Sequence, residues 1–69
     1  MTALPRRITI QLPDLDDEAY ARIANTTWEV VNAIAAGRHP FNVLHDRKTP
    51  AAELNRLADL DSARTRWRD

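Results

Sequence analysis

Apolar side chains recur at helical spacing over residues 20–35, and this pattern constrains the fold more than any other feature of the sequence. One row of positions advances in alternating steps of three and four residues, and a second row lies beside it. At about 100° per residue, the two rows cover roughly 160° of the helix surface. An arc this wide exceeds what one short helix can cover, so we expect it to pack on its own chain and on a second subunit. The two rows are Tyr20, Ile23, Thr27, Val30 and Ile34, and Ala24, Trp28, Val31 and Ala35.

The ends of this helix are well marked. Asp16 is a good N-cap, and Asp17 and Glu18 place negative charge in the first turn, where it stabilises the helix dipole. Gly37 supplies a left-handed position after the last turn, and Pro40 prevents continuation. These signals predict one helix from about residue 16 to residue 36, with the polar side chains Glu18, Arg22, Asn25, Glu29 and Asn32 on the opposite face.

A second, shorter helix is predicted after a connector at residues 37–48. Thr49 and Pro50 provide a cap followed by proline at the first helical position. The apolar stripe ends near residue 60, so the helix should span about residues 50–60 or longer. We expect the basic tail, residues 61–69, to lie outside the buried stripe, with Arg64, Arg66 and Arg68 around Trp67. The buried stripe of this helix is Leu54, Leu57, Ala58 and Leu60.

Residues 7–12 alternate apolar and polar side chains, a pattern typical of a β-strand that ends at Pro13. The sequence therefore predicts a small α+β fold in a single domain of residues 1–69: one strand at about 7–12, a long helix, a connector and a shorter helix. Edge strands invite pairing with another chain, so we expect an intertwined homodimer. Its predicted core consists of Ile8, Ile10, Leu12, Tyr20, Ile23, Val30 and Ile34.

Composition narrows the functional classes. The chain has 69 residues and no cysteine, and its ten Lys and Arg residues balance ten Asp and Glu residues. Small domains without disulfides or metals often complete their core by oligomerising. A neutral chain lacks the bulk positive field of a nucleic-acid binder, which lowers the expectation of a DNA partner. No apolar run fits a signal peptide or a membrane span, so a cytoplasmic protein with no membrane partner is expected.

Groups able to carry out catalysis are sparse. His39 and His45 form no constellation with a nucleophile, and their spacing matches no common zinc pattern. The single glycine excludes a glycine-rich phosphate loop. The sequence predicts a protein that is not an enzyme and that needs no cofactor or metal.

Aromatic and arginine side chains are the best candidates for contacts with a partner, because these types are enriched among binding hot spots. The predicted partner-binding residues are Trp28, Arg64, Arg66 and Trp67. Arginine beside tryptophan suits an acidic protein surface, or a nucleic acid by stacking. Core packing is the alternative role for Trp28, and a frayed, solvated tail is the alternative for residues 61–69.

Residues 6 to about 24 resemble the opening of ribbon-helix-helix repressors, in which paired strands enter the major groove. The resemblance implies that Arg7, Thr9 and Gln11 face the bases. Two features depart from the family. The turn between its two helices would fall near Glu29, inside the apolar stripe, and the acidic residues 14–18 crowd the face that would approach phosphate.

The chain as a whole looks like the small host-takeover proteins of temperate phages, in particular anti-activators that silence quorum-sensing transcription factors, some of which also block pilus assembly. This resemblance implies a non-enzymatic inhibitor of a host protein, most of all a transcriptional activator, in the host cytoplasm. Two alternatives remain open: a ribbon-helix-helix DNA-binding repressor, or an antitoxin with an N-terminal dimer and a toxin-binding helix at residues 49–68.

Overall fold

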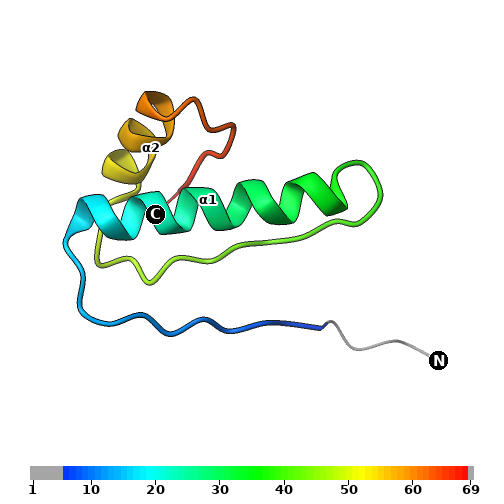
Figure 1. The fold of residues 1–69 in the computed structure, drawn as a ribbon, viewed down its shortest axis with the longest axis horizontal. Helices are drawn as coiled ribbons and strands as arrows, with labels where there is room; N and C mark the ends of the chain where they lie inside the picture. The colour runs from blue at the N-terminus through cyan, green and yellow to red at the C-terminus, as the bar shows by residue number, and fades with distance from the viewer. Residues whose placement is uncertain (1–5, 69) are drawn as a thin grey trace.

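The computed structural model describes residues 6–68 and contains two helices, α1 (Asp17–Ala35) and α2 (Ala51–Leu60) (Figure 1). The helix α2 lies against the N-terminal half of α1. The connector between the helices returns along the side of α1 away from α2, and the N-terminal segment runs farther out on that side (Figure 1). The residues after α2 fold back toward the middle of α1.

The helix α1 begins and ends within about one residue of the boundaries that its capping residues predict. The side chain of Asp16 accepts a hydrogen bond from the backbone N–H of Ala19 at 2.8 Å, as an N-cap does. Gly37 has a φ angle of 72°, a left-handed conformation that glycine adopts without strain. The helix α2 starts directly after Pro50 and ends at Leu60.

The predicted strand is wrong, and with it the α+β class, whereas the predicted homodimer stays a prediction. Residues 6–68 contain no β-strand, and residues 7–12 form an exposed segment in which the Ile8 side chain is 92% accessible. Alternation satisfies the period of a strand, but a strand also needs a neighbouring backbone for its hydrogen bonds. No other part of the described chain offers one, so the described fold is a pair of helices joined and flanked by irregular segments.

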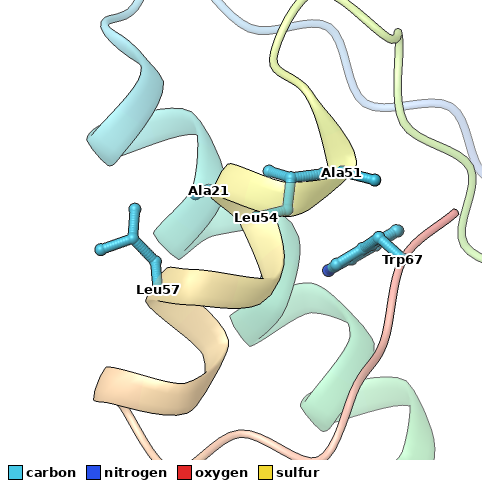
Figure 2. Packing of buried hydrophobic residues seen from close by; sticks show 5 residues of the cluster. All are labelled: Ala21, Ala51, Leu54, Leu57 and Trp67. Atoms are coloured by element: carbon cyan, nitrogen blue, oxygen red, sulfur yellow. The ribbon is translucent and has the colours of Figure 1, made fainter. Parts of the chain in front are cut away.

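The core lies between α1, α2 and the C-terminal segment, residues 61–68. Figure 2 shows Leu54 and Leu57 of α2 beside Ala21 of α1, with the ring of Trp67 entering from the C-terminal segment. Ala21 and Leu54 are completely buried. Because alanine carries a single methyl group, α1 allows α2 to approach closely at this point. The remaining buried member of the cluster is Ala51, and the partly buried side chains packed against it are Tyr20, Ala24, Trp28 and Val43.

Trp67 is buried in this core, with only 7% of its surface exposed, so the prediction that it lies outside the buried region is wrong. Its indole Nε1–H donates a hydrogen bond to Asn25 Oδ1 at 2.6 Å, and Asn25 Nδ2 donates to the carbonyl of Leu54 at 3.1 Å. Its backbone N–H donates to Asn55 Oδ1 at 2.8 Å, and Asn55 Nδ2 donates back to its carbonyl at 3.1 Å. These bonds attach the C-terminal segment to both helices.

The side of α1 that meets the core also differs from the prediction. The sequence predicts Asn25 on the solvent-facing side, but it is only 2% exposed. Ile23, Val30 and Ile34, which are predicted to lie in a dimer core, are exposed in the single chain. Asn25 is stable inside because its amide has two partners in the core, whereas a buried amide without partners would lose free energy.

Candidate protein-binding surface

A cavity of about 340 Å³ opens between the connector and the C-terminal segment. We call it the basic groove, and its lining residues are Val43, Leu44, His45, Arg47, Arg66, Trp67 and Arg68. His45 joins the connector to the C-terminal segment. Its Nε2 atom lies 3.0 Å from the carbonyl oxygen of Arg68, and its ring meets the ring of Trp67 edge to face, with centroids 5.6 Å apart. Because a carbonyl only accepts, Nε2 is the donor in this bond.

The connector side of the groove is itself anchored to α1. The backbone N–H of Asp46 donates to the Tyr20 hydroxyl at 3.0 Å, and Asp46 Oδ1 accepts from the backbone N–H of Lys48 at 2.9 Å. Thr49, which is buried, donates its hydroxyl proton to Asp17 Oδ1 at 2.8 Å. The groove is therefore bounded by segments with defined positions, although it contains no helix.

The charge of the groove is positive. Three arginines line it, and none of its lining residues is acidic. Arg66 is engaged by Asp59 at 2.6 Å and by the carbonyl of Thr65. Within residues 6–68, neither Arg47 nor Arg68 forms an ion pair. Two guanidinium groups thus remain available to carboxylates of another molecule, next to the exposed apolar side chain of Leu44.

A second surface is apolar and lies on α1. We call the side of α1 formed by Ile23, Thr27, Val30 and Ile34 the outer face. Val30 is 57% exposed and Ile34 is 77% exposed. The hydroxyl of Thr27 donates to the carbonyl of Ile23 at 2.8 Å, so it adds no unsatisfied donor to this face. Ile8, Ile10 and Leu12 of the N-terminal segment are exposed as well.

The predicted partner-binding residues do not form one surface. Arg66 and Trp67 line the groove, but Trp67 does so as part of a buried wall. Arg64 is exposed outside the groove, and its backbone N–H donates to Glu29 Oε1 at 2.6 Å. Trp28 is half-buried against Phe41, with ring centroids 5.5 Å apart, which agrees with the core alternative for this residue.

The residues named for DNA contact, Arg7, Thr9 and Gln11, are exposed on a segment that forms no ribbon in the described chain. The predicted dimer core is accessible in the single chain, apart from the half-buried Tyr20, and its burial in a dimer stays a prediction. Sequence reasoning missed Arg47, Arg68, Leu44 and His45. The only signal in the sequence is that basic and apolar side chains are neighbours in the connector. The fold then brings them close to Arg66 and Arg68, because the C-terminal segment returns to the connector.

Potential metal ligands in the described chain do not cluster. Residues 6–68 contain no group of three or more histidine or acidic side chains placed to hold a metal ion. A hydrogen bond from Arg56 lowers the pKa of Glu53, and the same bond raises the pKa of Arg56, but neither residue lines the groove. Neither α1 nor α2 has the length and apolar character needed to cross a membrane.

No family model, curated protein or solved structure matches this chain.

Proposed function

We propose that this chain is a small non-enzymatic regulator that inhibits another protein by binding it, with the basic groove as its main contact surface. The observation that carries the proposal is the pairing of two arginines without ion-pair partners in residues 6–68, Arg47 and Arg68, with the exposed side chain of Leu44 at one cavity. A neutral chain that places two arginines without ion-pair partners in residues 6–68 beside an apolar side chain is suited to an acidic protein segment.

Binding at this groove would combine two kinds of contact. Guanidinium groups form bidentate hydrogen bonds with carboxylates, and these bonds are stronger than those between neutral groups. An apolar side chain of the partner would cover Leu44 and exclude water from the neighbouring ion pairs, which strengthens them. The expected ligand is therefore a protein surface that presents acidic side chains next to an apolar one.

The proposed partner is a host transcriptional activator, bound in the host cytoplasm. The support for this identity is the likeness of the whole chain to phage anti-activators, which act by occupying a regulator rather than by modifying it. A protein of the pilus assembly machinery is a further target that the same resemblance implies. Occupation of an acidic surface on such a partner would block the contacts which that surface normally makes.

The two alternatives gain no support from the geometry. In a ribbon-helix-helix protein the chain would turn near residues 25–29, but α1 continues unbroken to Ala35. An antitoxin with a toxin-binding helix at residues 49–68 would need that segment to remain helical and accessible. Instead α2 ends at Leu60, and Trp67 is buried in the core.

The test is an affinity capture from host lysate with three versions of the chain. The double variant Arg47→Glu and Arg68→Glu reverses the charge of the groove, and Arg7→Glu is the matched control on an exposed residue outside it. We expect wild type and the control to capture the same activator. The double variant should lose at least about tenfold in affinity for it, which corresponds to about 1.4 kcal/mol.

The folded state of each variant is checked by circular dichroism and thermal unfolding. We expect the circular dichroism spectrum and the thermal midpoint to stay unchanged, since neither Arg47 nor Arg68 is buried or forms an ion pair with another residue of the described chain. Wild-type binding should also weaken as salt concentration rises. Equal binding by the double variant and the control would contradict the proposal, and so would a captured protein with no role in transcription or pilus assembly.

A further inference from the structure

The outer half of α1 carries no charge. Its residues are Ala19, Tyr20, Ile23, Thr26, Thr27, Val30, Val31, Ala33 and Ile34. At about 100° per residue these positions lie on the side of the helix away from Ala21 and Asn25, the residues buried against α2 and the C-terminal segment. The exposed side chains of Ile23, Val30 and Ile34 therefore form one uncharged stripe, and Tyr20 at its edge packs against the core.

The charged side chains of α1 all make contacts on the other half of the helix. Arg22 lies between Glu18 at 3.5 Å and Asp61 at 3.7 Å. Asp17 accepts from Thr49, and Glu29 accepts from the backbone N–H of Arg64. Solvated helix faces normally carry charge, so an uncharged and exposed face on a chain of this size indicates a surface that another molecule covers.

Charge lies only at the two ends of this face, and its sign differs between them. The exposed Asp14 and Asp16 precede α1, whereas the exposed Arg38 and His39 follow it. Antiparallel packing of two such helices would bring the acidic end of one copy to the basic end of the other. Parallel packing would place acid against acid. Antiparallel alignment also sets opposite ends of the two helix dipoles together.

In an antiparallel pair of α1 helices, the side-chain sizes on the outer face are also complementary. We propose that α1 of a second copy covers the outer face in antiparallel orientation, with the two-fold axis beside Thr26 and Thr27. Ile23 then lies across from Val30 of the second copy, and the small Ala19 lies across from the large Ile34. Asp14 lies across from His39, with Asp16 and Arg38 close by. A surface that is complementary to itself in this way is what a two-fold dimer requires.

None of the residues that line the basic groove belongs to α1, so the two proposed surfaces share no residue. Formation of this dimer does not require the proposed partner. It also differs from the strand-paired dimer, since it uses α1 and needs no β-strand.

The first experiment measures mass by light scattering at high micromolar concentration. We expect wild type to have twice the chain mass of 7.9 kDa. Ile34→Asp should give the single-chain mass with its helix content retained, because Ile34 is 77% exposed in the single chain and contributes little to its folding. The matched control is Leu60→Asp, a change at an exposed apolar residue of α2, and it should remain dimeric.

The second experiment tests orientation with single cysteines, which the absence of native cysteine makes unambiguous. Thr26→Cys or Thr27→Cys places a thiol beside the two-fold axis, so oxidation should link two copies through one or both of these sites. Ala19→Cys should not link, since antiparallel packing places it far from its counterpart. A monomeric wild type, a dimer unaffected by Ile34→Asp, or equal linking through Ala19→Cys would each overturn the inference.

Discussion

On the side of α1 that faces α2, a polar residue is buried, while on the opposite side large apolar residues are exposed. Asn25 is 2% exposed and has hydrogen-bond partners from α2 and from the C-terminal segment. Ile34 is 77% exposed and has none of the core around it. The difference teaches that burial here follows close helix approach and satisfied hydrogen bonds, rather than the hydrophobicity of each position. One side of α1 therefore stabilises the fold, whereas the other side is exposed in the single chain.

The strongest test of the comparison is Trp67→Ala, which removes the largest side chain of the buried side. Replacing a buried tryptophan by alanine costs about 3–5 kcal/mol, and Asn25 Oδ1 would also lose its donor. For so small a domain this is a large part of the total stability. Urea unfolding followed by circular dichroism should therefore show a largely unfolded variant. Leu44→Ala, at a residue that is 88% exposed, is the control and should unfold like wild type.

A smaller effect is expected from Trp67→Phe, which keeps an aromatic ring but removes the indole N–H. Asn25 Oδ1 then stays buried without its donor, and leaving such a group unsatisfied costs about 1–3 kcal/mol. Urea midpoints measure the change, with the exposed Asn42→Ala as control. A Trp67→Phe midpoint equal to that of wild type would mean that the bond to Asn25 does not stabilise the fold.

The smallest effect should come from the N-terminal segment. The double variant Ile8→Ser and Ile10→Ser changes two side chains that are exposed in the single chain, so its free energy of unfolding should lie within about 0.5 kcal/mol of wild type. Thermal and urea unfolding at low micromolar concentration measure this difference. A loss comparable to that of Trp67→Phe would show that the segment packs on the folded chain, and the contrast between the two sides would then fail.

Local signals predicted the helices because caps and periodicity act within a few residues. Asp16, Gly37 and Pro50 mark the ends of α1 and the start of α2 in the sequence and in the structure. The N-terminal strand failed because its hydrogen-bond partner would have to come from elsewhere, and alternation gives no information about that partner. Ala21 is fully buried, yet it does not belong to either apolar row of the sequence. Its contribution is its small size, which the pattern of apolar residues does not reveal.

The candidate site depended on contacts between distant parts of the sequence. Arg66 and Trp67 could be selected by residue type, but Trp67 is buried in the core and is not an exposed side chain available to a partner. Arg47 and His45 join them only because the C-terminal segment folds back on the connector. That return is held by Asn25 and Asn55, and polar residues at these positions do not reveal their distant partners in a sequence.

Hydrogen exchange at single sites, followed by NMR, tests the central claim most directly, because it compares the two regions in one molecule. The indole and backbone N–H groups of Trp67 donate to Asn25 and Asn55, so we predict that they exchange slowly, near the rate set by global unfolding. The backbone N–H of Ile10, in the exposed N-terminal segment, should exchange at the rate of an unstructured peptide. Fast exchange at both Trp67 sites together with protection at Ile10 would contradict the account.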